Sequence, residues 1–198
     1  MTPTPKQVRR NRGVLLLIVA LFFGSLLLAG ILRFSGWRPA GTKNFGELLD
    51  PPGDLRAHAP TLLDGRAYPW QPRARMWRIV VAPPADCGDA CARVAGQLDT
   101  VWQLMGKDAD HVDVLWLCPD EARCEVPAPL AREPSLRRLR ADAAVRAQLP
   151  RNDTDAGTLQ RGLPVYVIDP NGFVILRYAP GFAPAGLRAD LAKLTKLM

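Results

Sequence analysis

The pattern of apolar residues between Trp77 and Met105 predicts a strand followed by a helix. The run Ile79–Val81 is apolar and β-branched and ends at two prolines, which is typical of a buried strand. After it, apolar residues recur at spacings of four, three and four, which define one face of a helix: Val94, Leu98, Val101 and Met105. The same spacings, extended backwards, lead to Cys87 and Cys91. We therefore expect both thiols on the buried side of the helix start, just past the carboxyl end of the strand.

Further apolar runs predict the remaining strands. Residues 112–117 are expected to form a second strand parallel to the first, because a strand, a helix and a strand of this length make a right-handed βαβ unit. Residues 165–168 and 173–176 flank the sequence Asp-Pro-Asn-Gly, which fits a type I turn and predicts an antiparallel hairpin.

Two more helices are predicted, at residues 135–149 and from Pro184 onwards, while residues 118–134 and 151–162 are expected to be loops. The resulting order is β, α, β, α and then ββα. This order is thioredoxin-like, so the expected fold class is α/β, with a central mixed sheet flanked by helices.

A run of nineteen residues without a charge, Val14–Leu32, precedes this domain. At about 1.5 Å per residue it can cross roughly 30 Å of hydrocarbon, and it is longer than the apolar region of about 7–15 residues in a cleaved signal peptide. Four basic residues precede the run and three follow it, a small bias towards a cytoplasmic N-terminus. The predicted organisation is a cytoplasmic tail (1–13), a transmembrane helix (14–32), a linker (33–60) and a periplasmic domain (61–198), held in a bacterial inner membrane by a single pass.

The formal net charge is +7, yet we expect no nucleic-acid partner for a domain that lies outside the cytoplasm. Four cysteines in such a compartment fit the persistence of disulfides there. His58 and His111 are expected to be ordinary surface residues. The chain shows no Ser-His-Asp arrangement, no glycine-rich phosphate loop and no zinc-type ligand pair.

Several segments resemble the Sco/SenC proteins, thioredoxin-like and copper-binding factors for cytochrome c oxidase assembly. They are WRIVVAPPADCGDAC with its CxxxC spacing, the hairpin VYVIDPNGFVILRY and the membrane anchor. GTKNFGELLDPP and DPNGFVILRYAPG resemble more closely small membrane proteins encoded among bacterial oxidase assembly genes. The resemblance covers residues 42–198. It implies a membrane-anchored periplasmic factor that handles copper or thiols and whose partners are an oxidase subunit or other assembly factors.

The chain departs from the Sco pattern in its ligands. Sco proteins usually carry proline after each cysteine, where Gly88 and Ala92 stand here, and Arg161 lies near the position of their third copper ligand, a histidine. The resemblance implies a Cu(I) site on the thiolates of Cys87 and Cys91, which are soft donors. Cys118 ends the second parallel strand, so we expect it at the same edge of the sheet, where it is a candidate third ligand.

Other functions remain open. The chain can be a thiol–disulfide oxidoreductase with Cys87 and Cys91 as its redox pair, which would make it an enzyme, or a docking module whose disulfides are only structural. Four cysteines allow three pairings, of which Cys87–Cys91 with Cys118–Cys124 is the first choice. A bridge that closes only three residues restrains little of the unfolded chain, which favours a reactive pair over a structural one.

Overall fold

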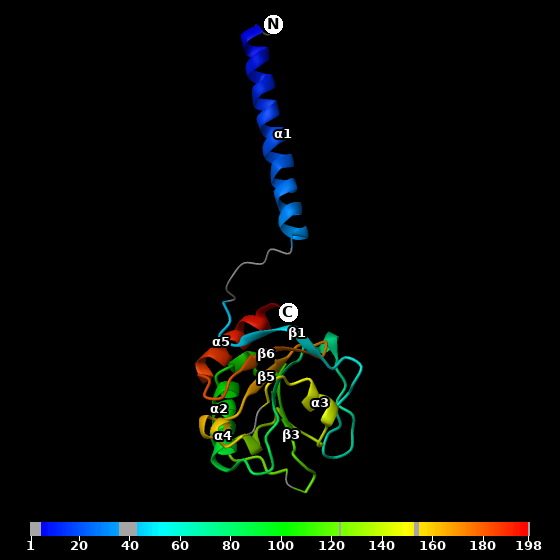
Figure 1. Ribbon diagram of the computed structural model, residues 1–198, viewed down its shortest axis with the longest axis vertical. Helices are drawn as coiled ribbons and strands as arrows, with labels where there is room; N and C mark the ends of the chain where they lie inside the picture. Colours follow the sequence, from blue (N-terminus) through cyan, green and yellow to red (C-terminus); the bar gives the residue numbers. More distant parts are fainter. Residues whose placement is uncertain (1–4, 36–42, 123, 153–154, 198) are drawn as a thin grey trace. The chain divides into compact units, whose positions relative to one another are not determined.

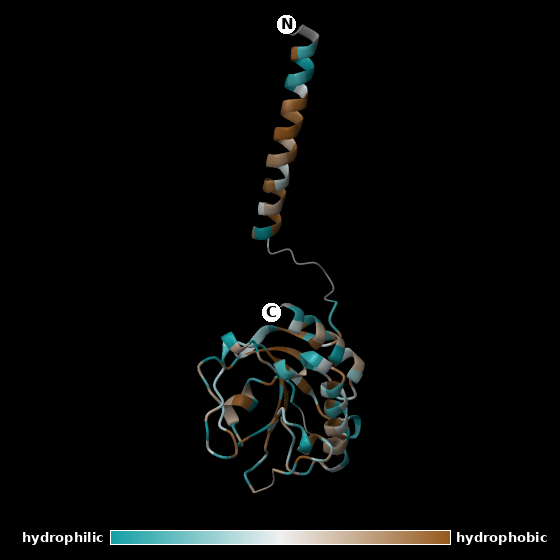
Figure 2. Cartoon of the chain, turned by 180° about the vertical axis from the view of Figure 1, so that it is seen from behind, coloured by the Kyte–Doolittle hydropathy of each residue, from teal (hydrophilic) through white to brown (hydrophobic). Residues whose placement is uncertain are grey.

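The computed structural model describes residues 5–35, 43–122, 124–152 and 155–197. The chain divides into two compact units, Met1–Thr42 and Lys43–Met198. In the first unit, α1 (Pro5–Phe34) is a single helix, and its part from Gln7 to Phe34 is long and apolar enough to cross a membrane (Figure 1). Figure 2 shows the apolar band along this helix.

The second unit is built on a six-stranded sheet with the order β1-β6-β5-β2-β3-β4. β2 pairs in parallel with β3, and β3 with β4, whereas the other pairs are antiparallel. The strands are β1 (Glu47–Asp54), β2 (Trp77–Val81), β3 (Val112–Leu117), β4 (Leu136–Leu139), β5 (Val165–Ile168) and β6 (Phe173–Tyr178). The sheet is therefore mixed, as predicted.

Helices lie on both sides of this sheet (Figure 1). They are α2 (Gly88–Gln103), α3 (Ala143–Ala147), α4 (Ala156–Arg161) and α5 (Pro184–Leu194), with short 3-10 turns at Pro72–Ala74, Gly106–His111, Leu130–Arg132 and Thr195–Leu197. Successive residues of β2 alternate between two cores. Ile79 and Val81 pack towards α2 and α5, and Val80 packs towards α3.

The helical stripe predicted from the sequence is confirmed along its whole length. Its six positions are at most 9% exposed: Cys87, Cys91, Val94, Leu98, Val101 and Met105. They pack on β2 and β3, whose parallel pairing is also confirmed. The predicted hairpin forms as β5 and β6, and the Gly172 N–H donates to the Asp169 carbonyl across its turn. The strand and helix periods thus identified the central unit correctly.

Part of the predicted linker is wrong, because residues 47–54 form β1 and pair with β6 at the edge of the sheet. Their prolines had indicated a turn. The register instead shifts between Leu48 and Gly53, so Pro51 and Pro52, which have no N–H to donate, lie in a bulge of an edge strand. Leu49 and Leu55 are buried in the core of the α3 side, which stabilises this pairing.

The predicted helix at residues 135–149 is also wrong over its first half. Residues 136–139 form β4, because the open edge of β3 supplies backbone partners whose pairing outweighs the helical spacing of the leucines. Only α3 remains helical, and Asp142 caps it by accepting from the N–H groups of Ala144 and Val145. The loop predicted at residues 151–162 contains α4, capped by Asp155.

Asp190 fastens the start of the domain to α5. Its carboxylate accepts from the N–H groups of Phe45 (2.8 Å) and Gly46 (3.0 Å), from the Tyr178 hydroxyl (2.8 Å) and from the Lys193 ammonium (3.1 Å). A Cβ atom at Gly46 would lie 2.6 Å from the Tyr178 ring, so only glycine allows this approach. Burial on its own raises the pKa of Asp190, but these hydrogen bonds outweigh it, and the pKa lies below its ordinary value.

Candidate functional site

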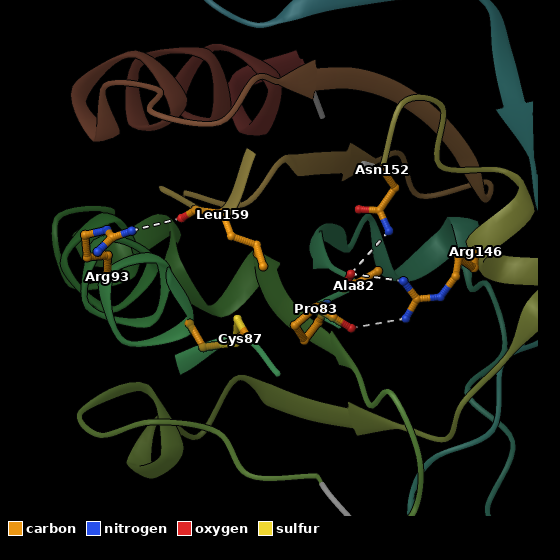
Figure 3. The surroundings of a disulfide bond; sticks show 8 residues. Ala82, Pro83, Cys87, Arg93, Arg146, Asn152 and Leu159 are labelled. Atoms are coloured by element: carbon orange, nitrogen blue, oxygen red, sulfur yellow. Dashed lines mark hydrogen bonds between the residues drawn. A yellow bond between two sulfur atoms is a disulfide. The ribbon is translucent and has the colours of Figure 1, made fainter. Parts of the chain in front are cut away.

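The segment that joins β2 to α2 is held by two side chains from outside the βαβ unit. The Arg146 guanidinium donates to the carbonyls of Ala82 (3.1 Å) and Pro83 (3.3 Å), and the Asn152 amide donates to Ala82 (3.2 Å), as Figure 3 shows. Burial lowers the pKa of Arg146. The loop that carries Cys87 is therefore fixed at its origin by a partly buried cation.

Cys87 and Cys91 form a disulfide at the start of α2, with their Cα atoms 5.4 Å apart. Cys87 is the N-cap residue of the helix, and both residues are buried, at 9% and 7% exposure. The N–H groups of a first helical turn carry a partial positive charge, which stabilises a thiolate formed there. The site can therefore stabilise the reduced, ionised form of Cys87.

Gly88 explains why proline does not follow the first cysteine. Its φ is +46°, in the left-handed region, whereas the proline ring fixes φ near −65°. A Cβ atom at Gly88 would meet nothing within 4 Å, so the backbone conformation and not crowding selects glycine. The chain thus enters α2 by a route that a Cys-Pro sequence cannot follow.

The disulfide lines a pocket of about 380 Å³. One wall is the β2–α2 loop, the other is the loop after β3, and Trp116 lies between them; the remaining lining residues are Pro83, Pro84, Ala85, Gly88, Pro119, Ala122, Glu125 and Pro127. Cys87 also lines a second hollow beside Arg93. The Arg93 guanidinium donates to the carbonyls of Leu159 (3.1 Å, drawn in Figure 3) and Gln160 (3.2 Å). Cys87 therefore lines both of these hollows, whereas Cys91 lines the first.

The second disulfide joins Cys118 to Cys124, with Cα atoms 4.9 Å apart, so the preferred pairing is confirmed. Cys118 is fully buried and belongs to the same core as Cys87 and Cys91, on the α2 side of the sheet. Its place after β3 had predicted the edge of the sheet, and the structure adds the face. Its sulfur is bonded to Cys124, however, so Cys118 can serve as a third ligand only after this disulfide is reduced.

The other candidate donors lie elsewhere. Arg161 is exposed at the end of α4 and offers no lone pair to a metal. His58 Nε2 lies 2.6 Å from Asp142 Oδ2, so this histidine supports the cap of α3, and His111 is exposed. Within the ranges that the structure describes, no three His, Cys, Asp or Glu side chains gather to hold a metal ion. The two thiols of a reduced Cys87–Cys91 pair fit Cu(I), which soft donors suit, but they do not make a three-ligand copper site.

Sequence reasoning missed the residues that support the site. Arg146, Asn152 and Arg93 reach carbonyl oxygens from other elements, and nothing in their local spacing distinguishes them from solvated arginines and asparagines. Only the tertiary arrangement brings them to the disulfide.

The mixed sheet, the helices on both faces and the disulfide at the α2 start define a thioredoxin-like protein. Residues 77–198 match the family model described as "Transmembrane-like, thioredoxin-like, C-terminal domain", and the chain belongs to this family. No curated protein matches the chain.

Solved structures that are similar to the chain include two proteins of the Sco group, which the sequence resembles. ScoI of Bradyrhizobium japonicum, with copper bound, is 21% identical, with a TM-score of 0.46, over 75% of this chain and 98% of that chain. Yeast Sco1, with copper bound, is 17% identical, with a TM-score of 0.49, over 80% of this chain and 96% of that chain. MTB DsbF, in mixed oxidised and reduced forms, is 13% identical, with a TM-score of 0.47, over 69% of this chain and 93% of that chain.

Proposed function

We propose that this chain is a membrane-anchored periplasmic assembly factor for cytochrome c oxidase that exchanges disulfides with the cysteines of a partner protein. The observation that carries the proposal is the Cys87–Cys91 disulfide, which lines a pocket at the N-terminus of α2. The reaction class follows from this bond and its surroundings. The oxidase as client rests on the resemblance of the cysteine and hairpin segments to the Sco/SenC group.

Cys87 is the residue that we expect a partner to engage. A partner thiolate attacks Cys87 Sγ, the Cys87–Cys91 bond breaks, and Cys91 leaves as a thiolate that takes up a proton. A second partner thiolate then attacks the partner's own sulfur in the mixed disulfide and releases Cys87. The partner is oxidised by two electrons and the CxxxC pair is reduced, and the reverse reaction reduces a partner disulfide. Cys87 suits this role because it borders two hollows and its thiolate lies at the helix N-terminus.

The anchor in this proposal is α1, with residues 14–32 in a bacterial inner membrane and residues 1–13 in the cytoplasm. Its support is the apolar length of the helix and the excess of basic residues before it. Residues 61–198, together with β1, then lie in the periplasm, where disulfides persist.

The reduction potential of the Cys87–Cys91 pair tests the proposed reaction. The Cys118→Ser/Cys124→Ser variant, which leaves one disulfide, is equilibrated in glutathione redox buffers, and its free thiols are counted after alkylation. We expect a potential above about −300 mV, within reach of an exchange partner. A Cys91→Ser variant should in addition accumulate mixed disulfides through Cys87. A potential below this value would instead indicate structural disulfides in a docking module.

Copper as a cargo is the second candidate function. The favourable observation is that Cys87 and Cys91 line the same pocket, so both sulfurs of the reduced pair are available to one ion. Two thiolates suffice for Cu(I), which accepts low coordination. Cu(II) would require nitrogen or oxygen donors that the described part of the site does not gather.

A further inference from the structure

The two disulfides lie on the same side of the sheet. Val114, Trp116 and Cys118 belong to the core under α2, together with Cys87 and Cys91. Trp116 pairs with Val81 in the parallel register, and the Cys118 N–H still donates to the Leu139 carbonyl (3.0 Å), so Cys118 continues β3 past this pair. It therefore lies beside the start of the loop that leads to Cys87.

Residues at or next to both disulfides line the same pocket. Cys87 and Cys91 line it directly, while Pro119 and Glu125, which follow the two cysteines of the second disulfide, line its opposite wall. The four cysteines differ in exposure, because only the residue at position 124 is half-exposed and the other three are buried. A thiolate released at position 124 can be hydrated, which makes it the better leaving group of the second disulfide.

We propose that Cys118–Cys124 is a second exchangeable disulfide, which receives two electrons from the reduced Cys87/Cys91 pair inside the same molecule. This inference rests on the exchange reaction of the proposed function. The Cys91 thiolate attacks Cys118 Sγ, the Cys118–Cys124 bond breaks, and Cys124 leaves as a thiolate and is protonated. The Cys87 thiolate then attacks Cys91 Sγ and releases Cys118, which takes up a proton. The first pair is oxidised again, and the second pair is reduced by the same two electrons.

The intermediate of this transfer is a Cys91–Cys118 disulfide, which a double variant can trap. The Cys87→Ser/Cys124→Ser variant of the full chain keeps only Cys91 and Cys118. It is reduced, freed of reductant and exposed to oxidised glutathione in detergent micelles, and samples are alkylated at intervals. We expect an internal disulfide between the two cysteines, identified by the mass of the linked peptides under non-reducing conditions. The Cys91→Ser/Cys118→Ser variant, which keeps the other two cysteines, is the matched control and should form its internal bond at least about tenfold more slowly, because the proposed transfer does not use that pair.

The wild-type chain gives a second measurement that does not depend on the folding of the variants. One equivalent of a dithiol reductant is added, and peptide masses after alkylation show which pair is reduced at each time. We expect thiols to appear first at positions 87 and 91 and then at 118 and 124, at a rate that does not depend on the concentration of reductant. A second step that stays proportional to this concentration, or a trap variant that keeps both thiols free or reacts no faster than its control, would overturn the transfer. If the first pair itself stays oxidised in the glutathione buffers that test the proposed function, that function fails as well, so the two failures are distinguishable.

Discussion

Replacing Arg146 by methionine should loosen the wall of the candidate site while keeping most of the side chain's packing. The guanidinium gives two hydrogen bonds, at 3.1 and 3.3 Å, to the carbonyls of Ala82 and Pro83. Hydrogen bonds from a charged donor contribute about 1.5 kcal/mol each, and part of this is offset because a half-buried cation no longer has to be desolvated. Asn152 still donates to Ala82 in the variant. We therefore expect the free energy of unfolding to fall by about 2 kcal/mol.

Urea unfolding of the oxidised full-length chain in detergent micelles, followed by tryptophan fluorescence, measures this change. Arg146→Lys should recover less than half of the loss, because an ammonium cannot hold both carbonyls in the planar geometry of a guanidinium. Arg138→Met, at an exposed position of β4, is the matched control and should stay within about 0.5 kcal/mol of the wild type. Dithiothreitol should also reduce the Cys87–Cys91 disulfide faster in Arg146→Met than in the wild type, and not faster in the control Arg138→Met. If Arg146→Met and Arg138→Met unfold at the same urea concentration, the hydrogen bonds from Arg146 to Ala82 and Pro83 have no energetic role.

Three further predictions concern the anchor, the metal and pH. A reporter that is active only in the periplasm should be active when fused after residue 198, and activity of a cytoplasmic reporter at that position would reverse the topology. Reduced protein should hold one Cu(I) against a competing chelator and bind Cu(II) poorly. Equal, weak retention of Cu(I) by the wild type and a Cys87→Ser/Cys91→Ser variant would exclude the copper role. Cys118→Ser should weaken Cu(I) binding only if Cys118 is a third ligand. Asp190→Asn should cost about 2–3 kcal/mol of stability near pH 7. Because the folded pKa of Asp190 lies below its ordinary value of 3.8, this contribution is present above pH 4 and is lost as the pH falls through the folded pKa. A loss of stability that is unchanged at pH 3 would contradict this linkage.

The sequence predicted the centre of the fold well and its edges poorly, for a physical reason. The strands β2 and β3 are buried along their whole length and are apolar apart from Arg78 and Asp113, and α2 has a single apolar stripe. The edge strands lack this signal. β4 contains Arg137 and Arg138, and β1 contains two prolines, so local spacing favoured a helix and a turn. Both segments become strands only because β3 and β6 have an open edge to fill.

For the site, the stripe that defined α2 placed Cys87 and Cys91 correctly on its buried face, whereas the end of β3 predicted only the edge of the sheet for Cys118 and not its face. The side chains that surround the disulfide could not be predicted from the sequence. Arg146 donates to carbonyls that lie 63 and 64 positions before it in the chain, and Arg93 donates to carbonyls that lie 66 and 67 positions after it. Such contacts depend on how the helices pack, which no local pattern records.

The way in which the fold supports the cysteine loop favours exchange over a purely structural bond. A disulfide that closes so short a loop is worth only about 2 kcal/mol in the chain-entropy model. The loop does not depend on this bond, because Arg146 and Asn152 hold its origin and the buried stripe of α2 holds its end. Opening the Cys87–Cys91 bond should therefore leave β2, α2 and the pocket in place. A pair that can open without unfolding its surroundings can be reduced, reoxidised or loaded with an ion repeatedly, as the proposed assembly role requires.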